Sequence, residues 1–146
     1  FNLHMGWGIA LFNQEDLVGA IKHWHRANNL KPGQGHLHYY LGTAYLSLKQ
    51  LDKAVQHLEI AIRLDINQAD YCYNLGLAYL ARGNNAEAIS IWERALILAP
   101  TAKTGLQLAS LYAQIGRPAQ ARRYAIQALN LGPTPQETNQ LRRLIE

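Results

Sequence analysis

The chain has 146 residues, of which 49% are hydrophobic, and a formal net charge of +4. This composition indicates a folded protein and excludes an intrinsically disordered one, and no apolar run is long enough to cross a bilayer. One cysteine, Cys72, excludes an internal disulfide and a zinc site built from cysteine pairs. Because the first residue is Phe1 and not methionine, we expect the sequence to be part of a longer or processed chain.

Apolar residues recur with helical periodicity along the whole chain, which predicts an all-helical protein. Gly83 and Gly116 stand where helices would end in a left-handed residue, and Glu15 and Lys49 occupy the corresponding turns, either under strain or in a different turn. Thr134 begins a capping box with Glu137. The predicted helices span residues 2–13, 17–29, 35–48, 52–64, 69–82, 86–98, 103–115 and 119–131, with a ninth after Thr134.

Two further residues, Asn67 and Thr101, are predicted N-caps of the helices that follow them. In the ninth helix the apolar positions form one narrow stripe, which is typical of a helix that covers the end of a stack, or of the first helix of a further unit. The stripe consists of Leu141, Leu144 and Ile145.

The sequence repeats itself about every 34 residues. Gly8, Gly42 and Gly76 are 34 residues apart, and Ala109 follows 33 residues later. Small residues therefore return at one position of each unit, where helices must approach closely, and the period predicts a stacked solenoid. We expect a single domain with units at 1–34, 35–68, 69–101 and 102–135 and a terminal helix at 135–146.

The third unit resembles a tetratricopeptide repeat. Its run from Tyr71 to Tyr79 contains Leu75-Gly76 followed by Tyr79, and the second unit repeats this pattern with Leu41-Gly42 and Tyr45. The resemblance implies antiparallel helix pairs stacked in a right-handed α-solenoid, closed by a capping helix, whose inner face binds peptides or proteins. It also implies that a Lys, Asn and Arg clamp for terminal carboxylates is absent, since only Asn74 and Lys103 match it.

Helical geometry separates two faces of each first helix. His38, Leu41, Gly42 and Tyr45 share one side of their helix and are expected to pack between helices. The opposite side should face outward, and in the resemblance it lines the concave groove. It is mostly apolar or aromatic, which is typical of a binding surface, although tyrosines could also pack between successive first helices. The predicted partner-binding residues are Met5, Ile9, Phe12, His36, Tyr39, Tyr40, Thr43, Asp70, Tyr73, Asn74, Leu77, Lys103 and Gln107.

The sequence contains no pattern typical of catalysis, of a cofactor or of a metal. His23 and His25 are two residues apart, as are His36 and His38, so each pair points to opposite faces of its helix. The fourth unit holds four Lys and Arg residues and no acid, but its arginines are not interleaved with stacking aromatics along one face. We therefore expect neither a nucleic-acid partner nor a membrane surface.

These patterns predict a non-enzymatic module that binds a peptide or helical segment of a protein in an apolar, tyrosine-rich groove. The alternative is a scaffold that forms homo-oligomers, in which the terminal helix or N-terminal segment of one chain occupies the groove of the next.

Overall fold

The computed structural model describes all 146 residues and consists of nine α-helices without a strand. The helices are α1 (Asn2–Asn13), α2 (Leu17–Leu30), α3 (Gly35–Ser47), α4 (Leu51–Leu64), α5 (Ala69–Ala81), α6 (Asn85–Leu98), α7 (Ala102–Gln114), α8 (Pro118–Leu129) and α9 (Pro135–Arg143). The all-helical prediction is confirmed, and helix ends agree with it to within two residues. None of the helices combines the length and apolar character needed to cross a bilayer.

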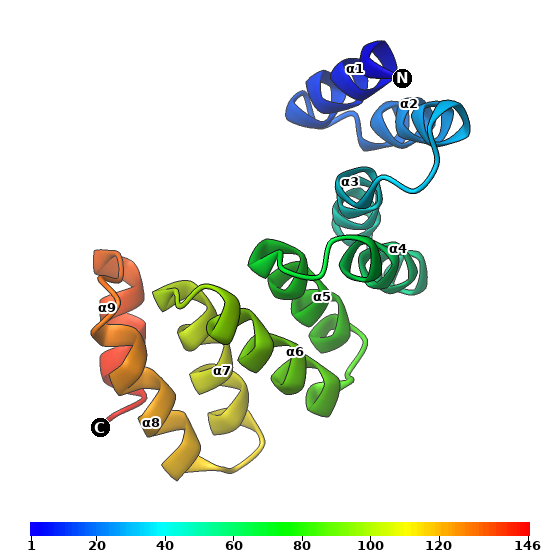
Figure 1. Cartoon of the computed structure of the whole chain (residues 1–146). Coiled ribbons are helices and arrows are strands. Elements are labelled where there is room, and N and C mark those ends of the chain that lie inside the picture. Colours follow the sequence, from blue (N-terminus) through cyan, green and yellow to red (C-terminus); the bar gives the residue numbers. More distant parts are fainter.

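The helices form four antiparallel pairs that stack in chain order. In Figure 1 the stack is an arc, with α1, α3 and α5 along one side and α2 and α4 along the other. Each second helix packs against the first helix of its own unit and against the first helix of the next unit. α9 lies against α7 and α8 and closes the C-terminal end. The predicted solenoid with a capping helix is therefore confirmed.

Glycines set the close approach within the pairs. A Cβ atom at Gly8 or Gly76 would collide with the indole of Trp24 or Trp92, because these rings lie directly against the glycine backbone. Both tryptophans are fully buried. The repeating glycine is therefore a packing requirement, since the ring of the second helix occupies the space that a side chain would need.

Each helix pair is joined by a short turn that contains one residue with positive φ. Gly83 and Gly116 adopt φ values of 82° and 74° at these turns. Glu15 and Lys49 adopt 64° and 60° at the equivalent positions, so they keep the same turn at the cost of strain that glycine avoids.

Two of the three predicted N-caps are confirmed. The Thr101 hydroxyl accepts a hydrogen bond from the Thr104 backbone N–H at 3.3 Å. Thr134 and Glu137 form a complete capping box. The prediction for Asn67 is wrong, because α5 begins after Gln68, whose side chain makes no capping bond.

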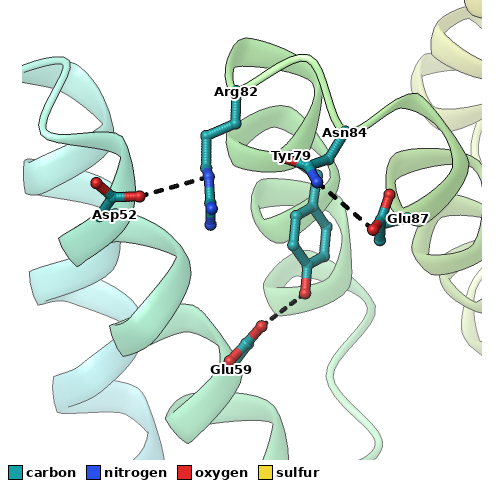
Figure 2. A network of polar contacts seen from close by, with 6 residues as sticks. All are labelled: Asp52, Glu59, Tyr79, Arg82, Asn84 and Glu87. Atoms are coloured by element: carbon teal, nitrogen blue, oxygen red, sulfur yellow. Dashed lines mark hydrogen bonds and ion pairs between the residues drawn. The ribbon is translucent and has the colours of Figure 1, made fainter.

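A tyrosine hydroxyl ties each unit to the preceding one. The tyrosine is the last residue of the Leu-Gly-x-x-Tyr pattern in the second and third units, and its partner lies on the second helix of the unit before. Figure 2 shows this contact between α5 and α4, beside an ion pair of Asp52 and Arg82 at 3.5 Å. The three bonds are Tyr45 with His25 at 3.0 Å, Tyr79 with Glu59 at 2.6 Å and Tyr112 with Glu93 at 3.3 Å.

Candidate functional site

The candidate site is the inner face, which we define as the side of α1, α3, α5 and α7 that carries the thirteen predicted residues. Asp70 and Lys103 are exposed. Met5 and Tyr73 are each only 8% exposed, so the prediction that they face solvent is wrong. Both pack between successive first helices, the possibility that the sequence left open for tyrosines. The half-buried members are Ile9, Phe12, His36, Tyr39, Tyr40, Thr43, Asn74, Leu77 and Gln107.

A hydrogen bond across the inner face joins α5 to α3. Asn74 Nδ2 donates to the Tyr39 hydroxyl at 3.2 Å and to the Asp70 carbonyl at 3.0 Å. Because a carbonyl can only accept, the amide is fixed with its NH₂ group toward these partners and its Oδ1 free. The Tyr39 ring also stacks on Tyr71, with centroids 4.6 Å apart. This end of the inner face therefore presents a fixed amide oxygen and a tyrosine hydroxyl.

The same arrangement recurs one unit later. Gln107 Nε2 donates to the Tyr73 hydroxyl at 3.4 Å, so the amide of α7 is tied to the tyrosine of α5. Lys103 lies over the Tyr73 ring, with Nζ 4.1 Å from the centroid. Burial raises the pKa of Tyr39 and of Tyr73, so both hydroxyls keep their protons near neutral pH. Tyr39, Asn74, Tyr73 and Gln107 form what we call the tyrosine–amide ladder.

A small pocket opens beside the ladder where α5 meets α7. Its volume is about 210 Å³, and Asp70 and Lys103 flank it with opposite charges. Tyr73 and Thr101 also line it. The pocket can take one short polar or amphipathic side chain, since it is smaller than the pockets that enclose whole small ligands.

The terminal helix contributes to the inner face in a way that the sequence did not reveal. A hollow of about 370 Å³ lies between α7 and α9, where Gln140 and Arg143 face Gln107 and Ser110. The signal was present in the register, because Gln140 and Arg143 flank Leu141 and Leu144 of the apolar stripe. Their neighbour Leu141 is fully buried, which holds α9 against its own chain.

The N-terminal half of the inner face is aromatic and closely packed. Tyr40 stacks on Trp24, with ring centroids 5.3 Å apart and planes 19° apart. Phe12 packs against the same indole at 5.7 Å. These rings leave little free polar surface, so recognition through hydrogen bonds is concentrated on α5 and α7.

Histidines from paired helices meet on the other side of the first helices. His38 Nδ1 lies 3.0 Å from His57 Nδ1, and His4 Nδ1 lies 3.0 Å from His23 Nδ1 one unit earlier. Spacing within one helix does not predict these contacts, because each partner comes from the other helix of the unit. Burial, followed by the nearby His38 and His25, lowers the pKa of His57 to about 4. No group of three or more His, Cys, Asp and Glu side chains is arranged to hold a metal ion.

The single cysteine is buried, as predicted from its place in the core. Cys72 is fully shielded from solvent, and burial raises the pKa of its thiol. A protonated, inaccessible thiol is a poor nucleophile, so Cys72 has a packing role.

Comparison with known families agrees with this architecture. A TPR repeat profile matches residues 42–83, and a tetratricopeptide repeat profile matches residues 69–102. No curated protein matches the chain in sequence.

Solved structures with the same fold include several tetratricopeptide repeat proteins. TTC0263, a protein of Thermus thermophilus, is 22% identical with a TM-score of 0.78, over 98% of this chain and 80% of that one. MamA is 21% identical with a TM-score of 0.88, over 98% of this chain and 79% of that one. YrrB, described as having an unusual peptide-binding site, is 21% identical with a TM-score of 0.85, over 96% of this chain and 73% of that one.

Proposed function

Because this chain carries tetratricopeptide repeats, which are protein–protein interaction modules, we propose that it binds an extended peptide segment of a partner along the inner face of α3, α5 and α7. The observation that carries the proposal is the tyrosine–amide ladder. Its two amides, Asn74 and Gln107, occupy equivalent positions one unit apart and are tied to tyrosines by their NH₂ groups.

Fixed amides favour recognition of a peptide backbone. Each amide oxygen is left available to accept a backbone N–H, and no rotamer freedom remains to be lost in the Asn74 side chain. The Tyr39 hydroxyl accepts from Asn74 and can donate its own proton to a peptide carbonyl. Alternate donors and acceptors at one-unit spacing match an extended chain better than a helix, whose backbone groups are already paired.

The remaining surface sets the expected side chains of the ligand. Leu77 lies half-buried between the two rungs of the ladder and offers an apolar contact. The pocket flanked by Asp70 and Lys103 suits one short polar side chain. Because few charges line the inner face, we expect binding to tolerate added salt.

Selection from a peptide library displayed on phage, followed by calorimetry of the selected peptide, tests the proposal. We expect Asn74→Ala and Leu77→Glu each to weaken binding by about 2 kcal/mol, or about thirtyfold. Ile97→Glu is the matched control, because Ile97 is 84% exposed on α6 and lies outside the inner face.

Alanine variants of Tyr39 and Tyr73 are poor tests, because both rings also hold successive first helices together. If the selected peptides bind Leu77→Glu as tightly as the unchanged chain, or lose affinity only in Ile97→Glu, the proposed site is wrong. Strong salt dependence of binding would likewise contradict it.

A further inference from the structure

The N-terminal end of the stack carries an exposed apolar surface. We define the α1 stripe as Leu3, Gly6, Trp7 and Ala10, which share one side of the helix. Leu3 and Trp7 are 59% and 51% exposed, and a Cβ at Gly6 would meet nothing within 4 Å. The Trp7 ring rests edge-on against His23, with centroids 5.1 Å apart, so its position is fixed. α1 is the end helix of the arc in Figure 1.

The same positions are covered in every other unit. Leu37, Leu41 and Ala44 correspond to Leu3, Trp7 and Ala10, and all three are fully buried where α2 packs on α3. The corresponding residues of α5 and α7 are also buried, against α4 and α6. A soluble repeat stack normally ends in a polar face, which α9 supplies at the C-terminal end. The α1 stripe has the composition of a covered surface.

α1 is nevertheless built differently from the first helices that receive a preceding unit. Each of those helices carries a tyrosine whose hydroxyl bonds the covering helix. Leu11 stands at that position in α1 and has no polar group to offer. The covering surface of α1 is therefore expected to be apolar throughout, unlike the second helix of a repeat unit.

We propose that the α1 stripe pairs with the α1 stripe of a second copy of this chain in an antiparallel, two-fold dimer. A two-fold axis that passes between Gly6 and Trp7 places Trp7 opposite the partner's Gly6 and Leu3 opposite the partner's Ala10. Each large side chain then meets a small one, so the stripe is complementary to itself. This interface lies outside the inner face and is independent of peptide binding.

The electrostatics of α1 favour this pairing. The helix contains no Asp, Glu, Lys or Arg, so two copies bring no like charges together. His4 has a lowered pKa, first because of desolvation and then because of His23, and stays neutral near pH 7. Antiparallel helices also align their dipoles favourably.

The size of the stripe limits the affinity. A stable interface buries about 800 Å² per partner, and one helix face provides less. We therefore expect a weak dimer, with a dissociation constant of about 1–100 μM.

Sedimentation velocity from low micromolar to several hundred micromolar chain tests the dimer, and acrylamide quenching locates the contact. Trp24 and Trp92 are fully buried, so Trp7 is the one indole that the quencher reaches directly. Quenching should decrease as concentration rises, in step with the increase in mass. A chain that stays monomeric over the whole range, or a dimer in which quenching is unchanged, overturns the proposal.

Two variants separate specific packing from general stickiness. Trp7→Glu should weaken the dimer at least tenfold, because it places a charge in the stripe. Gly6→Leu adds apolar surface but fills the space needed by the partner's Trp7, so it should also weaken the dimer at least tenfold. The open space around Gly6 lets the monomer accept this change, which keeps the test valid if Trp7→Glu fails to fold.

Ile97→Glu and Leu77→Glu are the controls, since neither residue belongs to the stripe. Both should dimerise like the unchanged chain, and loss of dimer in either one would assign self-association to another surface. A dimer strengthened by Gly6→Leu would identify unspecific apolar association and overturn the antiparallel pairing.

Discussion

Mild acid should destabilise the N-terminal half of the stack through its paired histidines. His57 contacts His38, with Nδ1 atoms 3.0 Å apart, and also faces His25, Tyr45 and Lys53. One of the two Nδ1 atoms must accept the hydrogen bond, so the pair cannot hold two protonated rings in this geometry. Protonation therefore favours the unfolded chain, in which the rings separate.

The sign and size of the effect follow from the pKa of His57. It is lowered from 6.5 to about 4 in the folded chain, so between these values the unfolded state binds more protons. The free energy of unfolding is then fully present above pH 6.5 and falls as the pH is lowered toward 4. Without solvent screening the loss between pH 7 and 5 is about 2 kcal/mol, and partial exposure reduces it to about 1 kcal/mol.

Urea unfolding monitored by circular dichroism at pH 7, 6 and 5 measures this loss. The window lies above the ordinary pKa of carboxylates, so histidines dominate the titration. The double variant His38→Cys with His57→Ile is the matched control, because it gives the second unit the residues that stand at these positions in the third, Cys72 and Ile91. It should lose most of the pH dependence and retain the part due to His4. An unchanged slope in this variant would refute the reasoning.

Other expected outcomes concern the turns and the buried rings. Glu15→Gly and Lys49→Gly should each stabilise the chain by about 0.5–1 kcal/mol in urea unfolding, because glycine relieves the positive φ; destabilisation would argue against strain. Trp92→Phe should cost about 1 kcal/mol more than Trp24→Phe, since Trp92 Nε1 donates to the Tyr73 carbonyl at 3.0 Å while Trp24 Nε1 has no partner in the chain. Equal losses by the same assay would show that this hydrogen bond contributes little.

Most of the fold could be predicted from the sequence because it depends on local and periodic signals. The helix limits follow from capping residues and left-handed turn residues, and these act over a few positions. The stacking follows from the period, since Gly8 and Gly76 must meet a ring that recurs in phase with them, Trp24 and Trp92. The choice between Asn67 and Gln68 as the start of α5 was beyond local signals, because neither side chain caps the helix.

The candidate site was predictable only as a face. Helical geometry indicates the side on which Tyr39 and Tyr73 lie, but not the distance to the next first helix. That distance buries Tyr73 and leaves Tyr39 half-buried. It also brings Asn74 and Gln107 onto the tyrosine hydroxyls, so residues predicted to bind a ligand directly are first bound to each other.

The sequence by itself determined the helices, their order and the side of each helix that packs, because these are set by neighbours within a few residues and by a repeat that is read along the chain. Only the tertiary structure decided which side chains meet across helices, as with His38 and His57, or Arg143 and Gln107. Such contacts depend on the spacing and tilt of whole helices, to which many small packing terms contribute at once. A residue pattern on one helix carries no record of that spacing.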